Sequence, residues 1–144
     1  MINDIISGMT NGIYDEFGSS YKIYTENIEQ GLSEPCFFIV LLEAGQSRII
    51  GNRFILSASF DVHYFPSTKA KNKEMQDVAQ RLHGVLQRIT LLDGDMLNGF
   101  ELKWEMVEDV LHFFVSYKPT LKYQEAAEED MAELIVAAKT KGGE

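Results

Sequence analysis

Two side chains in the stretch FDVHYFP (residues 60–66) could carry chemistry. Asp61 and His63 lie two positions apart, and a carboxylate beside an imidazole can act as an acid–base pair or contribute to a metal site. Either function needs further groups that converge from elsewhere in the chain. The other histidines, His83 and His112, show neither H-x-x-x-H nor H-E-x-x-H spacing, so no partner is evident from the sequence.

The residues around Asp61 alternate in polarity, which predicts where its side chain points. From residue 53 to 65 the even positions are apolar or aromatic, and the odd positions are mostly polar. A period of two over such a length is typical of a strand with one buried face. We therefore expect Asp61 and His63 to form a surface pair beside Ser57 and Ser59. We predict no catalytic, cofactor-binding or metal-binding residue.

The composition is that of one globular domain with an acidic surface. Of the 144 residues 45% are hydrophobic, and 13 basic against 22 acidic side chains give a formal net charge of −9. Such a surface lacks the basic patch that grips nucleic acid. The single cysteine, Cys36, excludes an intrachain disulfide and a cysteine-rich zinc site. Without a signal peptide or a long apolar run, we expect a cytoplasmic protein that binds no membrane.

Hydrophobic spacing predicts the elements that position these residues. The order is helix, three strands, helix and two strands, which predicts an α+β domain over residues 1–120. Its sheet is expected to be mostly antiparallel, with about five strands and both helices on one face. Residues 45–51 (GQSRIIG) are expected to form a loop between two glycines. The predicted helices cover residues 3–17 and 67–89, and the predicted strands cover residues 21–26, 35–44, 53–65, 100–107 and 110–118.

The last two predicted strands can be aligned residue by residue. If Glu108 and Asp109 form a two-residue turn, Val107 faces Val110. A slip of one residue would break the apolar match on one face, so this register is supported by the pattern itself. It places Trp104 in the core. The predicted apolar pairs are Met106 with Leu111, Trp104 with Phe113, Leu102 with Val115, and Phe100 with Tyr117, while Glu105 faces His112 and Lys103 faces Phe114 on the other side.

The segment at residues 121–144 has a different character from the domain. Acidic residues come first, and a short apolar group with Met131, Leu134 and Ile135 follows. The segment could form a short helix, an added strand, or an arm that orders only on a partner. We expect a partly flexible C-terminal arm.

Several stretches resemble a known family. The pieces QGLSEPCFFI (residues 30–39), GNRF (residues 51–54) and FDVHYFP are similar to the phage tail terminator family of long-tailed bacteriophages and prophage-like elements. The resemblance covers residues 1–120. It implies the small α/β fold shared by tail terminators, tube-joining proteins and minor tail protein U, with no cofactor and no enzyme activity.

The function that this resemblance implies is structural. A ring, usually of six copies, would cap the finished tail tube, stop its polymerisation and present a surface for joining the head. The implied partners are other copies of the chain, the tail tube protein, a head-completion or connector protein and, where a sheath exists, the sheath protein. DNA would pass through the lumen without specific binding, since acidic walls do not hold it. The implied location is the virion tail, assembled in the cytoplasm of a bacterial host.

A closed ring needs two different patches on each subunit. The apolar strand at residues 37–42, the stretch around Arg48 and the C-terminal arm are the candidates, although a strand inside the sheet and an ordinary loop would show the same patterns. The residues expected at the subunit or tube interface are Phe37, Ile39, Leu41, Arg48, Ile49, Ile50, Arg53, Met131, Leu134 and Ile135.

Two other classes of protein remain open. One is an adaptor or chaperone-like dimer of α+β fold that binds another protein through a sheet edge. The other is a small hydrolase or metal-dependent enzyme that uses Asp61 and His63 with His112 or Ser59. The mass of the native protein separates a ring from a dimer.

Overall fold

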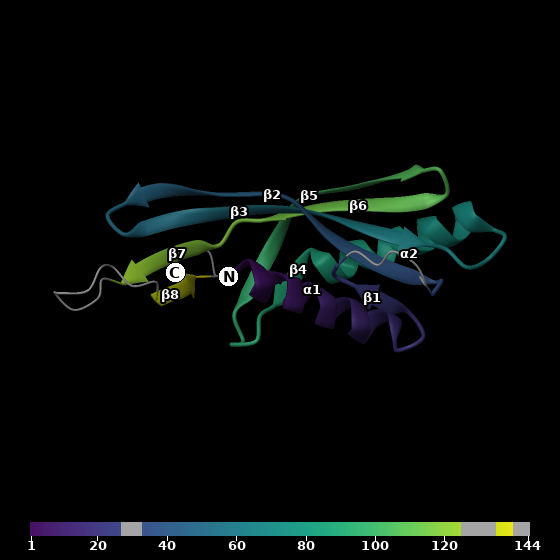
Figure 1. Ribbon diagram of the computed structural model, residues 1–144, viewed down its shortest axis with the longest axis horizontal. Coiled ribbons are helices and arrows are strands. Elements are labelled where there is room, and N and C mark those ends of the chain that lie inside the picture. The colour runs from purple at the N-terminus through teal and green to yellow at the C-terminus, as the bar shows by residue number, and fades with distance from the viewer. Residues whose placement is uncertain (27–32, 125–134, 140–144) are drawn as a thin grey trace.

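A computed structural model describes residues 1–26, 33–124 and 135–139 of the chain (Figure 1). The described strands form one sheet with the order β1-β2-β3-β6-β5-β4, and β7 pairs with both β3 and β8. In chain order the elements are α1 (Ile2–Phe17), β1 (Lys22–Tyr24), β2 (Cys36–Ile50), β3 (Arg53–Phe65), α2 (Lys71–Leu86), β4 (Arg88–Thr90), β5 (Met96–Val107), β6 (Val110–Tyr117), β7 (Thr120–Gln124) and β8 (Ile135–Lys139).

The predicted α+β class and the mostly antiparallel sheet are confirmed, because β1 with β2 is the one parallel pair among the described strands. The predicted count of about five strands is wrong, since β4, β7 and β8 are additional. Ile89 continues the apolar spacing of α2, which is why the predicted helix included it. The chain instead leaves the helix after Leu86, and Ile89 pairs with Leu97 of β5.

Both helices lie on the same side of the sheet, as predicted (Figure 1). Helix α1 packs against α2 and β4, and α2 also contacts β5 and β6. The apolar stripes of the two helices meet the inward face of the central strands, which places the core between the layers. The most deeply buried members are Ile5, Met9, Ile13, Met75, Leu82, Leu86, Phe60, Tyr64, Leu111 and Phe113.

The predicted register of β5 and β6 is confirmed from the turn to Lys103, which faces Phe114. Glu108 and Asp109 form the turn and have φ values of 51° and 66°, as a two-residue hairpin turn requires. Trp104 stacks on Phe113 with ring centroids 5.7 Å apart, but it is only half-buried at the margin of the core.

The register is wrong beyond Lys103, because a β-bulge shifts β5 by one residue. Gly99, rather than Phe100, faces Tyr117. The end of α2 explains the shift: a Cβ at residue 99 would lie 2.6 Å from the carbonyl oxygen of Leu86, so only glycine fits there. Phe100 is left 46% exposed. A local bulge of this kind leaves the alternating pattern of the flanking residues intact, so the sequence does not reveal it.

The hairpin of β2 and β3 is longer than predicted. Residues 45–50 continue β2, and the turn is formed by Gly51, with φ 57°, and Asn52. Glycine followed by asparagine between two strands is a two-residue hairpin signal, which the expectation of a loop overlooked. The far half of the hairpin extends past the helices to one end of the molecule (Figure 1). We call residues 41–55 the hairpin arm.

Candidate functional site

The register between β3 and β6 brings three titratable side chains together. Asp61 and His63 come from β3, and His112 comes from β6 directly opposite His63. His63 Nε2 and His112 Nδ1 each lie 3.0 Å from the same oxygen of Asp61, Oδ2. The two imidazole rings meet edge to face with centroids 4.5 Å apart. We call these three residues the His–Asp–His cluster.

The expectation of a surface pair is wrong in two respects. The side chain of Asp61 is only 9% exposed, and a third group, His112, converges on it. Asp61 does lie on the face away from the helices, but Val40 of β2 and Phe114 of β6 flank it on either side. Alternation along one strand reports the face of a residue and not the size of its neighbours on adjacent strands, so the burial could not be predicted.

The charge of Asp61 is only partly compensated. Burial raises the pKa of Asp61, but the hydrogen bonds from His63 and His112 outweigh it and leave the pKa below its ordinary value. The carboxylate is therefore ionised at neutral pH. Its other oxygen, Oδ1, is buried and has no hydrogen-bond partner within the described part of the chain. An orphaned oxygen on a buried carboxylate is costly, which makes the cluster a candidate for cation binding or proton transfer.

The hydrolase alternative loses one of its proposed groups. The side chain of Ser59 hydrogen-bonds to Ser116, with the two oxygens 2.8 Å apart, rather than to a histidine. The structure thus assembles Asp61, His63 and His112, but it does not add a serine nucleophile to them.

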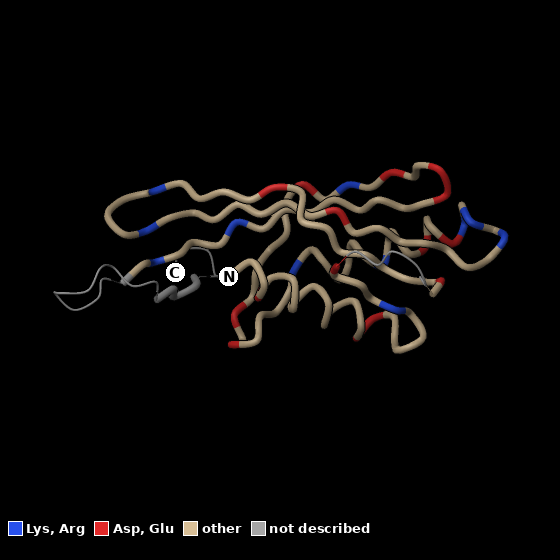
Figure 2. The backbone as a smooth tube through the Cα atoms, in the orientation of Figure 1, with Lys and Arg blue, Asp and Glu red and all other residues tan. Residues whose placement is uncertain are grey.

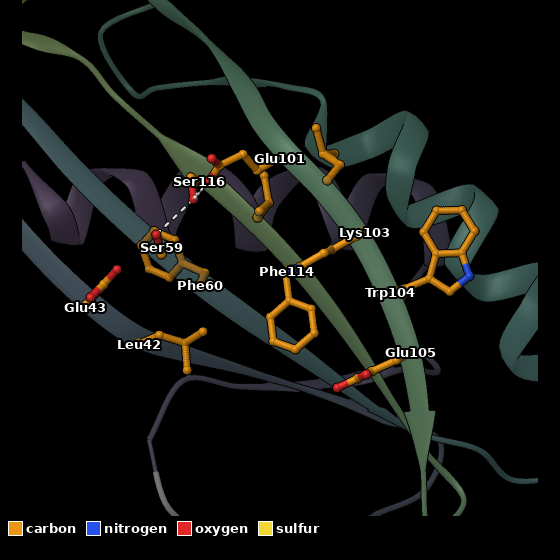
Figure 3. A pocket seen from close by; sticks show the side chains of 12 residues that line it. Leu42, Glu43, Ser59, Phe60, Glu101, Lys103, Trp104, Glu105, Phe114 and Ser116 are labelled. Atoms are coloured by element: carbon orange, nitrogen blue, oxygen red, sulfur yellow. Dashed lines mark hydrogen bonds between the residues drawn. The ribbon is translucent and has the colours of Figure 1, made fainter.

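An open pocket of about 730 Å³ lies on the same face of the sheet as the cluster (Figure 3). Leu42 and Phe114 supply its apolar surface, and the carboxylates of Glu43, Glu101 and Glu105 lie around it. Lys103 is the one basic residue in its lining, 5.8 Å from the Phe114 ring. The lining carries more negative than positive charge, and we call it the acidic pocket.

The hairpin arm has the opposite character. Its charged side chains beyond Glu43 are Arg48 and Arg53, and Lys122 of β7 faces Arg53 near its tip (Figure 2). The outer edge of the arm is unpaired among the described strands, since β1 covers β2 only from Cys36 to Phe38. An exposed edge with apolar side chains is a ready surface for another chain. The exposed apolar residues are Leu41, Leu42, Ile49, Ile50 and Ile55.

The predicted interface residues divide into three groups. Phe37 and Ile39 are 0% and 3% exposed, so they belong to the core and have no surface to offer a neighbour. Their apolar pattern came from the sheet interior, which was the alternative explanation. The arm carries Leu41, Arg48, Ile49, Ile50 and Arg53. Met131 and Leu134 lie outside the described residues, and Ile135 begins β8, where only the backbone is described.

The sequence analysis missed the acidic pocket and one exposed residue of the arm, Ile55. The sequence did contain a signal for the arm. Apolar residues recur between residues 41 and 50, and neither of the two predicted helices remains to cover them. The pocket has no such signal, since its lining comes from four strands and depends on their registers.

Comparison with known protein families gives one result that bears on function. A family model described as phage tail terminator protein matches residues 4–130. A comparison with curated proteins finds no match. Within the described residues, no helix has the length and apolar character needed to cross a membrane.

Proposed function

This chain belongs to the phage tail terminator family, which indicates a structural role in a phage tail, and we propose that its copies form the ring that ends the tail tube. The ring would have six subunits, stop tube polymerisation and provide the surface that joins the head. Its partners would be the tail tube, the head-completion or connector protein and, in a contractile tail, the sheath. The proposed role is structural rather than enzymatic, in the tail of the virion.

The observation that carries the proposal is the hairpin arm. It keeps an unpaired strand edge and exposed apolar side chains, with Ile50 at 70% exposure. Soluble proteins usually shorten, charge or cover such an edge. In a family of tail proteins, the simplest reason to keep it is that an adjacent subunit covers it.

We propose that the arm of one subunit docks on the acidic pocket of the next. The charges are complementary, since Arg48 and Arg53 would approach Glu101 and Glu105. Apolar parts also match, with the isoleucines of the arm opposite Phe114. Leu42 and Glu43 at the start of the arm line the pocket, but the tip of the arm, residues 48–53, shares no residue with it. A contact between the tip of one subunit and the pocket of the next joins two different patches, which is the kind of contact that closes into a ring.

The arm is held in shape within the single subunit. The guanidinium of Arg48 lies 4.8 Å from the centre of the Phe54 ring and donates a hydrogen bond to the carbonyl oxygen of Gly51. Tyr123 of β7 packs edge-on against Phe54 at 5.1 Å and donates to Gln46 Oε1 at 3.0 Å. A preformed arm loses less conformational entropy on association, which favours a stable contact.

The lumen of the proposed ring would carry DNA without binding it. The formal net charge of −9 repels the phosphate backbone on average. The two arginines of the arm, Arg48 and Arg53, would be used in the contact between subunits.

The test is a charge reversal on the arm. We expect the native protein to have six times the mass of the 16.3 kDa chain, and the double variant Arg48→Glu, Arg53→Glu to be smaller. The control, Lys69→Glu with Lys73→Glu, makes the same change of net charge on exposed residues near the start of α2 and should leave the ring intact. Tail length is measured in parallel, and the arm variant should allow overlong tubes.

Charge swapping identifies the contact itself. Adding Glu101→Arg and Glu105→Arg to the arm variant should restore much of the ring, because the attraction is rebuilt with the signs exchanged. A native mass of one or two chains for the unmodified protein would favour the adaptor alternative instead. A ring that survives the arm reversal would place the subunit contact elsewhere.

A further inference from the structure

We propose that the His–Asp–His cluster binds one divalent transition-metal ion, with Zn²⁺ as the best match. The proposal does not depend on ring formation, because all three ligands come from one subunit. It assigns a function to Asp61, His63 and His112, which neither the core nor the proposed ring contact uses.

The geometry is close to that of a bound ion. One ligand atom from each residue lies within 4.8 Å of the other two, and both nitrogens are 3.0 Å from Asp61 Oδ2. Zinc–nitrogen bonds of about 2.0–2.1 Å place tetrahedral ligands roughly 3.3 Å apart. An ion would therefore lengthen the two 3.0 Å separations by a few tenths of an ångström, and the two nitrogens, which lie within 4.8 Å of each other, would approach by up to about 1.5 Å. The ligands stand on two paired strands, β3 and β6, which hold their spacing.

The charge of the cluster also calls for a cation. Asp61 is a buried carboxylate with one oxygen that lacks a donor, and the two histidines supply only neutral hydrogen bonds when they are unprotonated. Glu105 lies directly opposite His112 and adds negative charge on the same face. A divalent ion bound by this carboxylate would compensate its negative charge, which unprotonated histidines do not.

The proton balance of binding is simple. In the free cluster, His63 Nε2 and His112 Nδ1 donate to Asp61, so each ring carries its proton on the nitrogen that would bind the metal. On binding, a ring that is neutral changes tautomer and carries its proton on the other nitrogen, and a ring that is protonated releases one proton to solvent. The histidine side chains are 27% and 22% exposed, so solvent can mediate this exchange.

The donor set selects the class of ion. Two imidazoles and one carboxylate suit Zn²⁺ and its neighbours Co²⁺ and Ni²⁺, whereas Mg²⁺ and Ca²⁺ prefer sites built from oxygen alone. Three protein ligands leave one position of a tetrahedral ion open, on the face of the sheet away from the helices.

Metal titration of the native protein is the first test. Protein treated with a chelator and then freed of it is titrated with Zn²⁺ in the presence of millimolar Mg²⁺, which occupies exposed carboxylates. We expect one saturable site per chain in calorimetry and a rise in Tm with Zn²⁺, because an ion that binds only the folded chain stabilises it. Co²⁺ should give the visible absorption of a low-coordinate site. No saturable binding at submillimolar Zn²⁺ would overturn the proposal and leave a hydrogen-bonded cluster.

Variants then locate the site. Asp61→Asn and His112→Gln should each weaken Zn²⁺ binding by a factor of about 10 or more. The matched control is His83→Gln, an exposed histidine on α2, which should bind as the native protein does. If the cluster variants do not fold, the histidine signals of the native protein decide by NMR. Zn²⁺ should shift those of His63 and His112 and leave that of His83 in place. Equal binding by all variants, or a shift at His83 alone, would refute the assignment.

Discussion

Strand β2 carries apolar residues at both ends, and the surroundings of the two ends are opposite. Phe37, in the half covered by the helices, is 0% exposed, and Ile50, in the hairpin arm, is 70% exposed. The apolar residues of the covered half hold the fold together, whereas those of the arm bury little within the subunit. In the proposed ring the exposed apolar side chains of the arm contact another subunit, so the comparison separates the stability of the subunit from its assembly.

The arm is nevertheless not a loose extension. Next to its turn, the β3 strand of the arm is paired with β7, where Arg53 faces Lys122 and Ile55 faces Thr120. Phe54 is partly covered by Tyr123 and Arg48, so the arm has a small packed group of its own. Substitutions in the covered half should therefore lower the stability of the subunit, whereas substitutions in the arm should affect assembly and change stability little.

The largest contrast is expected between two alanine variants on the same strand. Phe37→Ala removes a ring that packs on Phe17 at 4.8 Å and on Tyr64 at 4.9 Å, and it should lower the free energy of unfolding by about 3–5 kcal/mol. Ile50→Ala should change it by under about 0.5 kcal/mol. Denaturant melts at protein concentrations too low for assembly measure both. Similar losses at the two positions would show that the arm is part of the folding core.

A second pair compares glycines in the two regions. A Cβ at Gly99 would lie 2.6 Å from the carbonyl oxygen of Leu86 and 2.9 Å from Val115 Cγ2, so Gly99→Ala should destabilise the protein by about 1–3 kcal/mol. A Cβ at Gly45, in the arm, would meet nothing within 4 Å. Gly45→Ala should therefore be neutral or slightly stabilising in thermal melts. A harmless Gly99→Ala would mean that β5 and α2 are less tightly packed than the bulge implies.

A third change tests the turn that links the covered end of β3 to α2. Glu74 accepts hydrogen bonds from Tyr64 Oη, from the backbone N–H groups of Ser67 and Thr68, and from Thr68 Oγ1. Since several of these bonds are exposed, Glu74→Gln should cost only about 1–2 kcal/mol in unfolding free energy. Thr68→Ala is the milder comparison, because it removes one of the four donors.

The pH dependence of stability gives a further check on Glu74. Burial raises its pKa, but the hydrogen bonds led by that from Thr68 outweigh it and leave the pKa below the ordinary value of 4.5. A carboxyl whose pKa is lowered in the folded state contributes stability above its ordinary pKa and loses it as the pH falls toward the folded value. The native protein should thus weaken below about pH 4.5 more steeply than Glu74→Gln. Identical acid profiles would show that these bonds do not favour the charged form.

Sequence reasoning succeeded where one element decides the outcome and failed where several do. Alternation in β3 correctly predicted which of its residues face inward. The turn between β5 and β6 correctly predicted the register of these strands as far as Lys103. The bulge beyond it depends on the end of α2, and the burial of Asp61 depends on side chains of β2 and β6. Short strands such as β4, of three residues, carry too little pattern to be separated from the helix before them.

The smallest effect on stability is expected from removing the C-terminal segment after Tyr123. Strand β8 pairs with β7 alone among the described strands, whereas Leu121, which is 1% exposed, and Tyr123 remain in the shortened chain. The N–H of Tyr123 also donates to the carbonyl oxygen of Asn52 at 2.9 Å, so the tip of the arm should stay in place. We expect a loss of under about 1 kcal/mol in unfolding free energy. A truncation after Pro119, which also removes β7, is the comparison and should cost clearly more.

The same truncation tests whether the segment after Tyr123 contributes to assembly. Residues 125–133 hold five acidic side chains, so an apolar group as short as that near Met131 buries little by itself and gains most on a partner surface. Because Leu121 of β7 belongs to the core, we propose that the domain ends after β7, a few residues beyond the boundary at residue 120 that the sequence predicts, and that the segment after it contacts an adjacent subunit, the tube or the connector. Native mass, tail length and head joining are measured on the shortened protein, and at least one should be impaired while the melt is preserved. A collapsed melt would assign the segment to the core of the subunit, and unchanged assembly in all three measurements would show it to be dispensable.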